Sequence, residues 1–143
     1  MLYVLEMSND ADIIATQLAP QWPAPAARYT WGQVSVGGLA IPAGSDIIVI
    51  AHGNNDEIGN AAAGVIDIDA AAFLALVFFN MGGAPANIYI SACGQQFAGF
   101  AANVALLAGQ NNIWAHTIIH GHYDPVVGTV PPPTALSWVA IYP

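Results

Sequence analysis

Apolar residues come in short runs, separated by segments that contain glycine, proline or polar residues. Two runs share one pattern: 46–53 (DIIVIAHG) and 87–94 (NIYISACG) start on a polar residue and continue through Ile, Val and Tyr. Short, nearly continuous apolar runs of this kind predict strands that are covered on both faces, as in a parallel sheet. The first run delivers His52 near its end and the second delivers Cys93, the only cysteine.

The remaining pattern predicts the other elements of an α/β fold. Strands are expected at 2–7 and 112–119, an edge strand or hairpin at 28–36, helices at 11–19, 70–80 and 96–107, and a last strand, fitting an antiparallel edge, at 135–142. Asp69 stands where a helix N-cap is expected. The polar segment 54–60 predicts an exposed loop beside His52. The turn 8–10, at the carboxyl end of the strand 2–7, is expected to face the same rim as His52. Strands alternating with helices indicate a mostly parallel sheet, in a single domain over 1–143.

Composition excludes several classes of function. The longest apolar run, 70–79, has ten residues, whereas a membrane span needs about 20, so a buried helix is predicted and no membrane anchor. The net charge of −8, with one Arg and no Lys, leaves nothing to neutralise phosphates, which argues against nucleic acid as a partner. No basic residue precedes Arg28, so no secretory signal is predicted. The expected location is the cytoplasm, or delivery as part of a bacterial effector.

Cys93 and His52 are a candidate nucleophile and base. Side chains that follow adjacent parallel strands meet at one edge of an open α/β sheet. A thiolate is the reactive form of cysteine, and a neighbouring imidazole or helix N-terminus favours it. Glycine follows both residues, so the backbone can approach a substrate closely. The amides of Gly53 and Cys93 are then candidates for an oxyanion hole.

At these residues the chain resembles a known family. An apolar strand ending in His-Gly (52–53), followed after a helix by one ending in Ala-Cys (92–93), is similar to the clan CD cysteine peptidases. This group includes caspases, metacaspases, gingipains, clostripain and the self-cleaving cysteine protease domains of bacterial toxins, to which this chain is closest in character. The resemblance spans about residues 2–119. It implies a caspase-like, three-layer α/β/α sandwich, with His52 as catalytic base, Cys93 as nucleophile and Gly53 in the oxyanion hole.

The family patterns also suggest substrate-binding residues. Relatives that cut after Arg or Lys carry an acid two residues before the nucleophile, where this chain has Ser91. Basic specificity therefore needs Asp10, Asp56 or Asp124 in place of that acid. Caspases bind a substrate Asp through pocket arginines, and Arg28 alone does not supply them. Toxin domains favour leucine before the cut, which an apolar pocket would suit. Their activation by inositol hexakisphosphate requires basic residues that this chain lacks.

Two further clusters have alternative interpretations. His120, His122 and Asp124 have the HxHxD spacing of some zinc sites. Metallohydrolases of that kind usually place another His after the Asp, where this chain has Pro125. His122 and Asp124 are therefore predicted to lie in a loop that either shapes the substrate cleft or satisfies its own hydrogen bonds. Asp56 and its neighbour Glu57 either orient the His52 imidazole, attract a basic substrate, or form a solvated loop. No metal and no organic cofactor is predicted.

The sequence thus predicts a cysteine endopeptidase that acts on peptide or protein substrates. Two alternatives stay open: a catalytically silent domain of the same architecture that binds a partner, and a cysteine hydrolase or transferase acting on a non-peptide acyl group. The high apolar content also fits an exposed apolar patch used for homodimerisation or partner docking.

Overall fold

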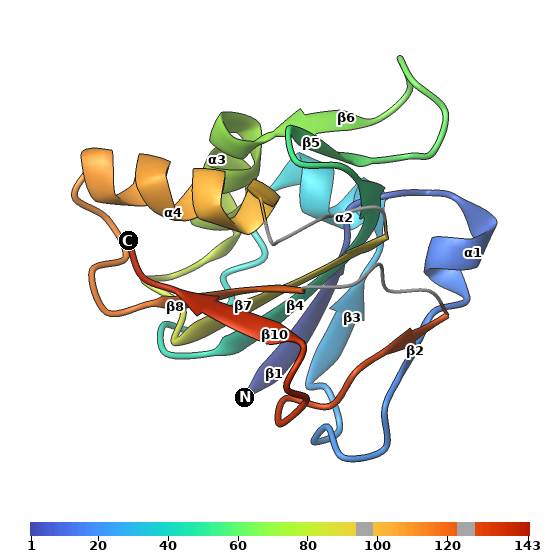
Figure 1. Ribbon diagram of the computed structural model, residues 1–143, viewed down its shortest axis with the longest axis horizontal. Helices are drawn as coiled ribbons and strands as arrows, with labels where there is room; N and C mark the ends of the chain where they lie inside the picture. The colour runs from blue at the N-terminus through green and yellow to red at the C-terminus, as the bar shows by residue number, and fades with distance from the viewer. Residues whose placement is uncertain (94–98, 123–127) are drawn as a thin grey trace.

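The computed structural model describes residues 1–93, 99–122 and 128–143, with Cys93 described through its backbone alone. These residues form a mixed α/β fold around a mostly parallel sheet of eight strands (Figure 1). Six of the strands lie in the order β10-β8-β7-β4-β1-β3, and β5 and β6 extend the sheet beside β4. The predicted α/β class and mostly parallel sheet are confirmed.

The elements have the following bounds. The large sheet contains β1 (Leu2–Glu6), β3 (Ala27–Tyr29), β4 (Asp46–Gly53), β5 (Glu57–Gly59), β6 (Asp67–Asp69), β7 (Asn87–Cys93), β8 (Ile118–His122) and β10 (Trp138–Ile141). A separate parallel pair consists of β2 (Gln17–Leu18) and β9 (Thr129–Val130). The helices are α1 (Ala11–Ile14), α2 (Trp31–Val36), α3 (Ala70–Asn80) and α4 (Gly99–Gln110).

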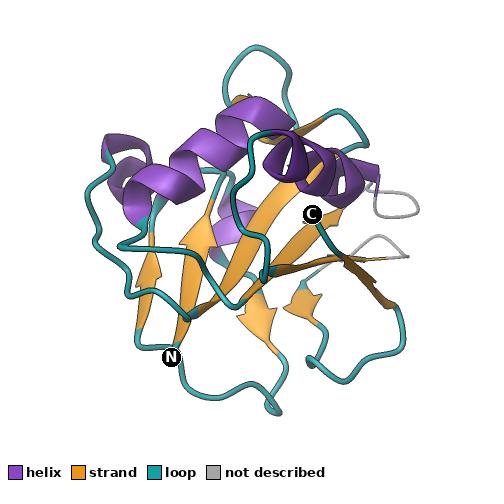
Figure 2. Cartoon of the chain, turned by 90° about the vertical axis from the view of Figure 1, so that its left-hand side faces the viewer, coloured by secondary structure: helices purple, strands orange, loops and turns teal. Residues whose placement is uncertain are grey.

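The two faces of the sheet are covered differently (Figure 2). Because side chains alternate along a strand, Ile47 and Val49 of β4 join the core under α2, α3 and α4, whereas Ile48 and Ile50 join the opposite core. In the first core, Phe73 of α3 meets Phe100 of α4 edge to face, with ring centroids 5.5 Å apart. The second core is covered by the short α1, by Trp22 and by the β2–β9 pair. All-apolar strand centres are thereby buried on both faces.

Several predicted elements are confirmed closely. β4 has the predicted bounds, and β7 ends at Cys93. α3 begins after Asp69, whose carboxylate accepts a hydrogen bond from the Ala72 amide at 2.8 Å. β10 runs antiparallel to β8 along the edge of the sheet. α4 confirms the predicted helix 96–107 from Gly99 onward, and residues 96–98 lie outside the described part of the chain.

The strand predicted at 28–36 is wrong after its first residues. β3 ends at Tyr29, and Thr30 starts α2 with a capping box: its hydroxyl accepts from the Gln33 amide, and the Gln33 side chain accepts from the Thr30 amide. Thr-x-x-Gln is a sequence signature of a helix N-terminus, and here it outweighs the β-branched and aromatic composition, which favours a strand.

Three other boundaries also differ from prediction. The helix expected at 11–19 stops at Ile14, because residues 17–18 pair with β9 instead. The strand expected from 112 begins at Ile118, because Asn112 and Trp114 have positive φ angles of 55° and 58° that a strand does not accommodate. The loop expected at 54–60 contains β5, which pairs antiparallel with the end of β4 and buries Ile58.

Some large apolar side chains remain on the surface. Phe78 and Phe79 at the end of α3 are 55% and 71% exposed, and Val36 of α2 is 85% exposed. Among the described residues, no helix combines the length and the apolar character that crossing a membrane requires.

Candidate active site

Parallel pairing of β4 with β7 brings the backbones of His52 and Cys93 side by side. The register runs from Asp46↔Asn87 to His52↔Cys93, so the two residues are partners at the carboxyl ends of adjacent strands. On its other side His52 is paired with Gly59 of β5. The sheet therefore places His52 between the strand that ends on Cys93 and the hairpin that follows β4.

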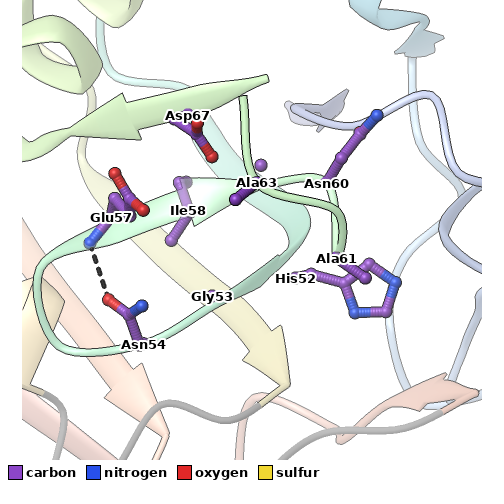
Figure 3. A pocket seen from close by; sticks show the side chains of 10 residues that line it. His52, Gly53, Asn54, Glu57, Ile58, Asn60, Ala61, Ala63 and Asp67 are labelled. Atoms are coloured by element: carbon purple, nitrogen blue, oxygen red, sulfur yellow. Dashed lines mark hydrogen bonds between the residues drawn. The ribbon is translucent and has the colours of Figure 1, made fainter. Parts of the chain in front are cut away.

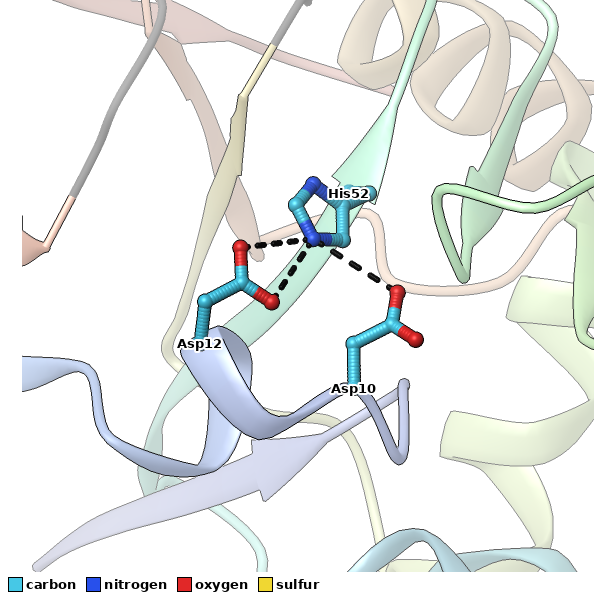
Figure 4. Close-up of side chains that lie close together, drawn as sticks. All are labelled: Asp10, Asp12 and His52. Carbon is cyan, nitrogen blue, oxygen red and sulfur yellow. Dashed lines mark hydrogen bonds and ion pairs between the residues drawn. The ribbon is translucent and has the colours of Figure 1, made fainter.

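The imidazole of His52 contacts two carboxylates, that of Asp10 in the turn between β1 and α1 and that of Asp12 in α1 (Figure 4). Its Nε2 lies 2.9 Å from Asp12 Oδ2 and 3.0 Å from Asp12 Oδ1. Asp10 Oδ2 is 3.5 Å from the same nitrogen. The His52 side chain is 17% exposed and that of Asp12 is 66% exposed. The hydrogen bond from His52 lowers the pKa of the Asp12 carboxyl, so Asp12 stays ionised beside the ring.

Hydrogen bonds hold this acidic turn against the segment that follows β5. The Ala61 amide donates to Asp10 Oδ2 at 2.8 Å. The Ser8 hydroxyl donates to Asn60 Oδ1 at 2.6 Å, and the Asn60 amide group donates to Asn9 Oδ1 at 2.6 Å. Asp10 occupies the N-cap position of α1 without a side-chain capping bond, because its carboxylate faces the Ala61 amide and the His52 ring. The prediction that this turn faces the His52 rim is confirmed.

A partly buried ion pair fixes the other end of α1. Arg28 of β3 bonds Glu6 of β1, Nε to Oε2 at 2.6 Å, and the Glu6 side chain is 6% exposed. The guanidinium also donates to backbone oxygens just after and within α1, at 2.7 Å to Thr16 and 3.2 Å to Ile13. Arg28 therefore has a structural position, which agrees with its exclusion as a substrate-binding cation.

A pocket of about 350 Å³ opens beside His52, beneath the β5–β6 hairpin (Figure 3). Its walls include His52, Gly53, Asn54, Glu57 and Asp67, so its polar groups are mainly amides and carboxylates. The hairpin explains Gly53 structurally: a Cβ there would lie 2.7 Å from Ile58 Cγ2. The glycine that was predicted to allow substrate approach is thus also required for β5 to pack on β4.

The predicted substrate-binding residues fall in different places. Asp10 contacts the His52 ring, as described above. Asp56 is exposed at the tip of the β4–β5 turn, and Glu57, not Asp56, lines the pocket. The carboxylates that contact the imidazole are those of Asp10, in the β1–α1 turn, and Asp12, in α1, whereas Asp56 has the exposed position of a solvated loop residue.

Ser91 and His122 are both buried. Ser91 is 3% exposed, and its hydroxyl has no hydrogen-bond partner in the part of the chain that the structure describes. His122 is 4% exposed; its Nε2 lies 2.6 Å from Ser137 Oγ and its ring packs edge to face on Trp138. Both residues therefore have core surroundings. Asp124 lies outside the described residues.

Sequence reasoning missed Asp12. It recognised Asp10 as a residue of the turn, but Asp12 sits inside α1 and resembles a solvated residue of the first helical turn. Two signals were available: Asp12 follows the carboxyl end of β1, and that end adjoins the end of β4 in a parallel sheet. An imidazole held by a carboxylate at a strand end can accept and return a proton, with the carboxylate stabilising its charged form.

Comparisons of the chain with protein-family models, with curated proteins and with solved structures find no match. The functional assignment therefore depends on the geometry of the residues themselves.

Proposed function

We propose that the protein is a cysteine endopeptidase in which Cys93 is the nucleophile, His52 the base and Asp12 the residue that positions the imidazole. The observation that carries this proposal is the register pairing of His52 with Cys93 at the carboxyl ends of two adjacent parallel strands. The contact between Asp12 and His52 Nε2 adds the third member of a nucleophile, base and orienting acid arrangement.

The tautomer follows from the carboxylate contact. An ionised carboxylate only accepts hydrogen bonds, so the Nε2 that faces Asp12 carries the ring proton in the neutral imidazole. Nδ1 is then the basic nitrogen that takes the thiol proton from Cys93. Asp12 favours the imidazolium that results, because it lies 2.9 Å from the protonated Nε2. Since Asp12 is 66% exposed, water weakens this contribution compared with that of a buried acid.

The reaction has two halves. The Cys93 thiolate attacks the peptide carbonyl carbon, and the amides of Gly53 and Cys93 stabilise the tetrahedral oxyanion. The C–N bond breaks as the His52 imidazolium gives its Nδ1 proton to the leaving amine, which leaves a thioester on Cys93. Water then attacks the thioester while Nδ1 takes a proton from it, and the proton returns to the departing thiolate.

We propose in addition that the fold is that of the clan CD peptidases. A clan CD relationship is supported by the order of the His-Gly and Ala-Cys strands, by their adjacency and by the parallel sheet around them. In a three-layer caspase-like arrangement, α2, α3 and α4 would form the layer on one face of the sheet, and α1 with the β2–β9 pair would form the layer on the other face.

A peptide-library digest tests the proposed activity. The wild-type chain should generate new peptide termini, and Cys93→Ala and His52→Ala should generate none. His116→Ala is the matched control, because it removes an exposed imidazole elsewhere. A panel of peptidyl acyloxymethyl ketones, read by intact mass, should label wild-type Cys93 covalently.

Failure of both assays would reject the endopeptidase. Transfer of a non-peptide acyl group to Cys93 would move the assignment to the other hydrolase class. Unreactive Cys93 in every assay would favour a binding domain.

A further inference from the structure

The carboxylates around His52 also form a metal-ligating set. Asp10, Asp12 and His52 each offer one ligand atom, and these atoms lie within 4.8 Å of one another. We propose that the three residues bind a divalent transition-metal ion of the zinc class, and that the bound ion takes the His52 imidazole out of use as a base. The second part of this statement rests on the proposed function, whereas the first does not.

The distances suit such an ion. Bonds of about 2.0–2.1 Å to nitrogen and oxygen place the ligands of a tetrahedral zinc ion about 3.4 Å apart. His52 Nε2 is 2.9 Å from Asp12 Oδ2 and 3.5 Å from Asp10 Oδ2, which brackets this value. The ligand atoms of all three residues lie within 4.8 Å of one another, so an ion can replace the Nε2 proton once the two carboxylates move toward each other by up to about 1.4 Å. Figure 4 shows both carboxylates converging on the one ring nitrogen.

The donor set selects the class of ion. Imidazole suits zinc, cobalt, nickel and copper, whereas calcium and magnesium prefer oxygen ligands alone. The imidazole distinguishes this site from a group of surface acids, and its ring is largely buried at 17% exposure, so the strand end fixes its position. Asp12, at 66% exposure, leaves a route for the ion and room for bound water.

The supply of positive charge favours a cation here. The chain has one Arg and no Lys, and that arginine, Arg28, is bonded to Glu6 at 2.6 Å. Neither lysine nor arginine is therefore left to neutralise Asp10 and Asp12. The Ala61 amide already bonds Asp10 Oδ2 at 2.8 Å, which supplies the outer-shell hydrogen bond that ligating carboxylates usually have.

Metal binding would prevent His52 from acting as a base, because it changes which ring nitrogen carries the proton. When the ion occupies Nε2, a neutral imidazole carries its single proton on Nδ1. Nδ1 then has no lone pair with which to take the thiol proton of Cys93. The ion and the catalytic proton transfer thus exclude each other at one ring.

Calorimetric titration of the full chain with ZnCl₂ tests the site itself. The wild-type chain should bind one equivalent, and Asp12→Asn and His52→Gln should each weaken the affinity at least about tenfold. Asp56→Asn and His116→Gln are matched controls, because they remove an exposed acid and an exposed imidazole elsewhere. Both should bind as the wild type does, and so should Cys93→Ala. Circular dichroism confirms that each variant is folded.

Three outcomes would overturn the metal site: no binding by the wild type, undiminished binding by Asp12→Asn, or loss of binding in Cys93→Ala. A second measurement, alkylation of Cys93 by iodoacetamide, should slow about three- to fourfold with saturating ZnCl₂ and recover with EDTA. An unchanged alkylation rate in the zinc-saturated chain would overturn the inhibition. If Cys93 has only ordinary reactivity without zinc, the proposed function fails, while the calorimetry still decides the metal site.

Discussion

Replacing Arg28 by methionine removes the ion pair that holds α1, and with it Asp12, beside the sheet. The Arg28 Nε bonds Glu6 Oε2 at 2.6 Å, and an Nη group donates to the Thr16 carbonyl at 2.7 Å. Glu6 has a side chain that is only 6% exposed. Arg28→Met therefore leaves a buried carboxylate without its partner and a backbone carbonyl without its donor.

The expected cost follows from burial. Removing one partner of a fully buried ion pair costs about 3–5 kcal/mol. Because the Arg28 side chain is 28% exposed, water reaches its side of the pair, and the expected loss is at the lower end, about 3 kcal/mol. Domains of this size are stable by about 5–15 kcal/mol, so the variant should still fold at 25 °C, with a clearly lower denaturation midpoint.

Urea unfolding followed by far-ultraviolet circular dichroism measures this cost. Arg28→Met and Glu6→Met should each lower the free energy of unfolding by about 3 kcal/mol, and the double variant should regain part of the loss, because it leaves no unpaired charge. A change below about 0.5 kcal/mol in Arg28→Met, or strict additivity of the two substitutions, would show that the pair does not hold α1 in place.

Three further predictions concern stability. Burial lowers the pKa of His120 below its ordinary value, so on acidification the unfolded chain binds a proton at this residue before the folded chain does, and the free energy of unfolding should fall as the pH drops below about 6.5. Urea titrations at pH 7.5 and 5.5 should show this fall, which should be smaller in His120→Gln and unchanged in His116→Gln. Gly59→Ala should cost at least about 2 kcal/mol in urea unfolding, because φ is 150° and a Cβ would overlap a backbone carbonyl; an unchanged midpoint would contradict the hairpin geometry. Phe73→Ala should lower the free energy of unfolding by about 3–5 kcal/mol in the same assay, because Phe73 is 0% exposed. Phe79→Ala, at a 71% exposed position, should lower it by under about 0.5 kcal/mol, and similar losses in the two variants would contradict the assigned core.

Local sequence patterns were enough to predict the two central strands of the sheet. β4 and β7 are apolar runs with clear polar starts, so their bounds and parallel pairing could be predicted. The Asp69 cap marked the start of α3. The same rule about strand ends placed the turn at Asp10 beside His52, which the structure confirms.

The remaining features depend on contacts between distant segments. α1 ends early because Gln17 and Leu18 pair with β9, more than 100 residues later, and no local pattern encodes that pairing. The contact of Asp12 with His52 follows from this short helix and its position beside β4. β5 and β6, which form the hairpin at the pocket, have only three residues each, too few for a sequence pattern to mark a strand, so only their pairing with each other and with β4 identifies them.

The rate of Cys93 alkylation tests the central claim most directly. At pH 7 a thiol of ordinary pKa is only about 3% thiolate. A neighbouring imidazole that brings the pKa of a thiol to about 7 makes half of it thiolate, a gain of about sixteenfold, while a Brønsted slope of about 0.4–0.5 over about 1.5 pKa units removes a factor of about four to five. Iodoacetamide should therefore label wild-type Cys93 about three- to fourfold faster than free cysteine, with His52→Ala returning to the ordinary rate and His116→Ala, which removes an exposed imidazole elsewhere, matching the wild type. Equal rates in the wild type and in folded His52→Ala would contradict a nucleophile and base pair at the ends of β7 and β4.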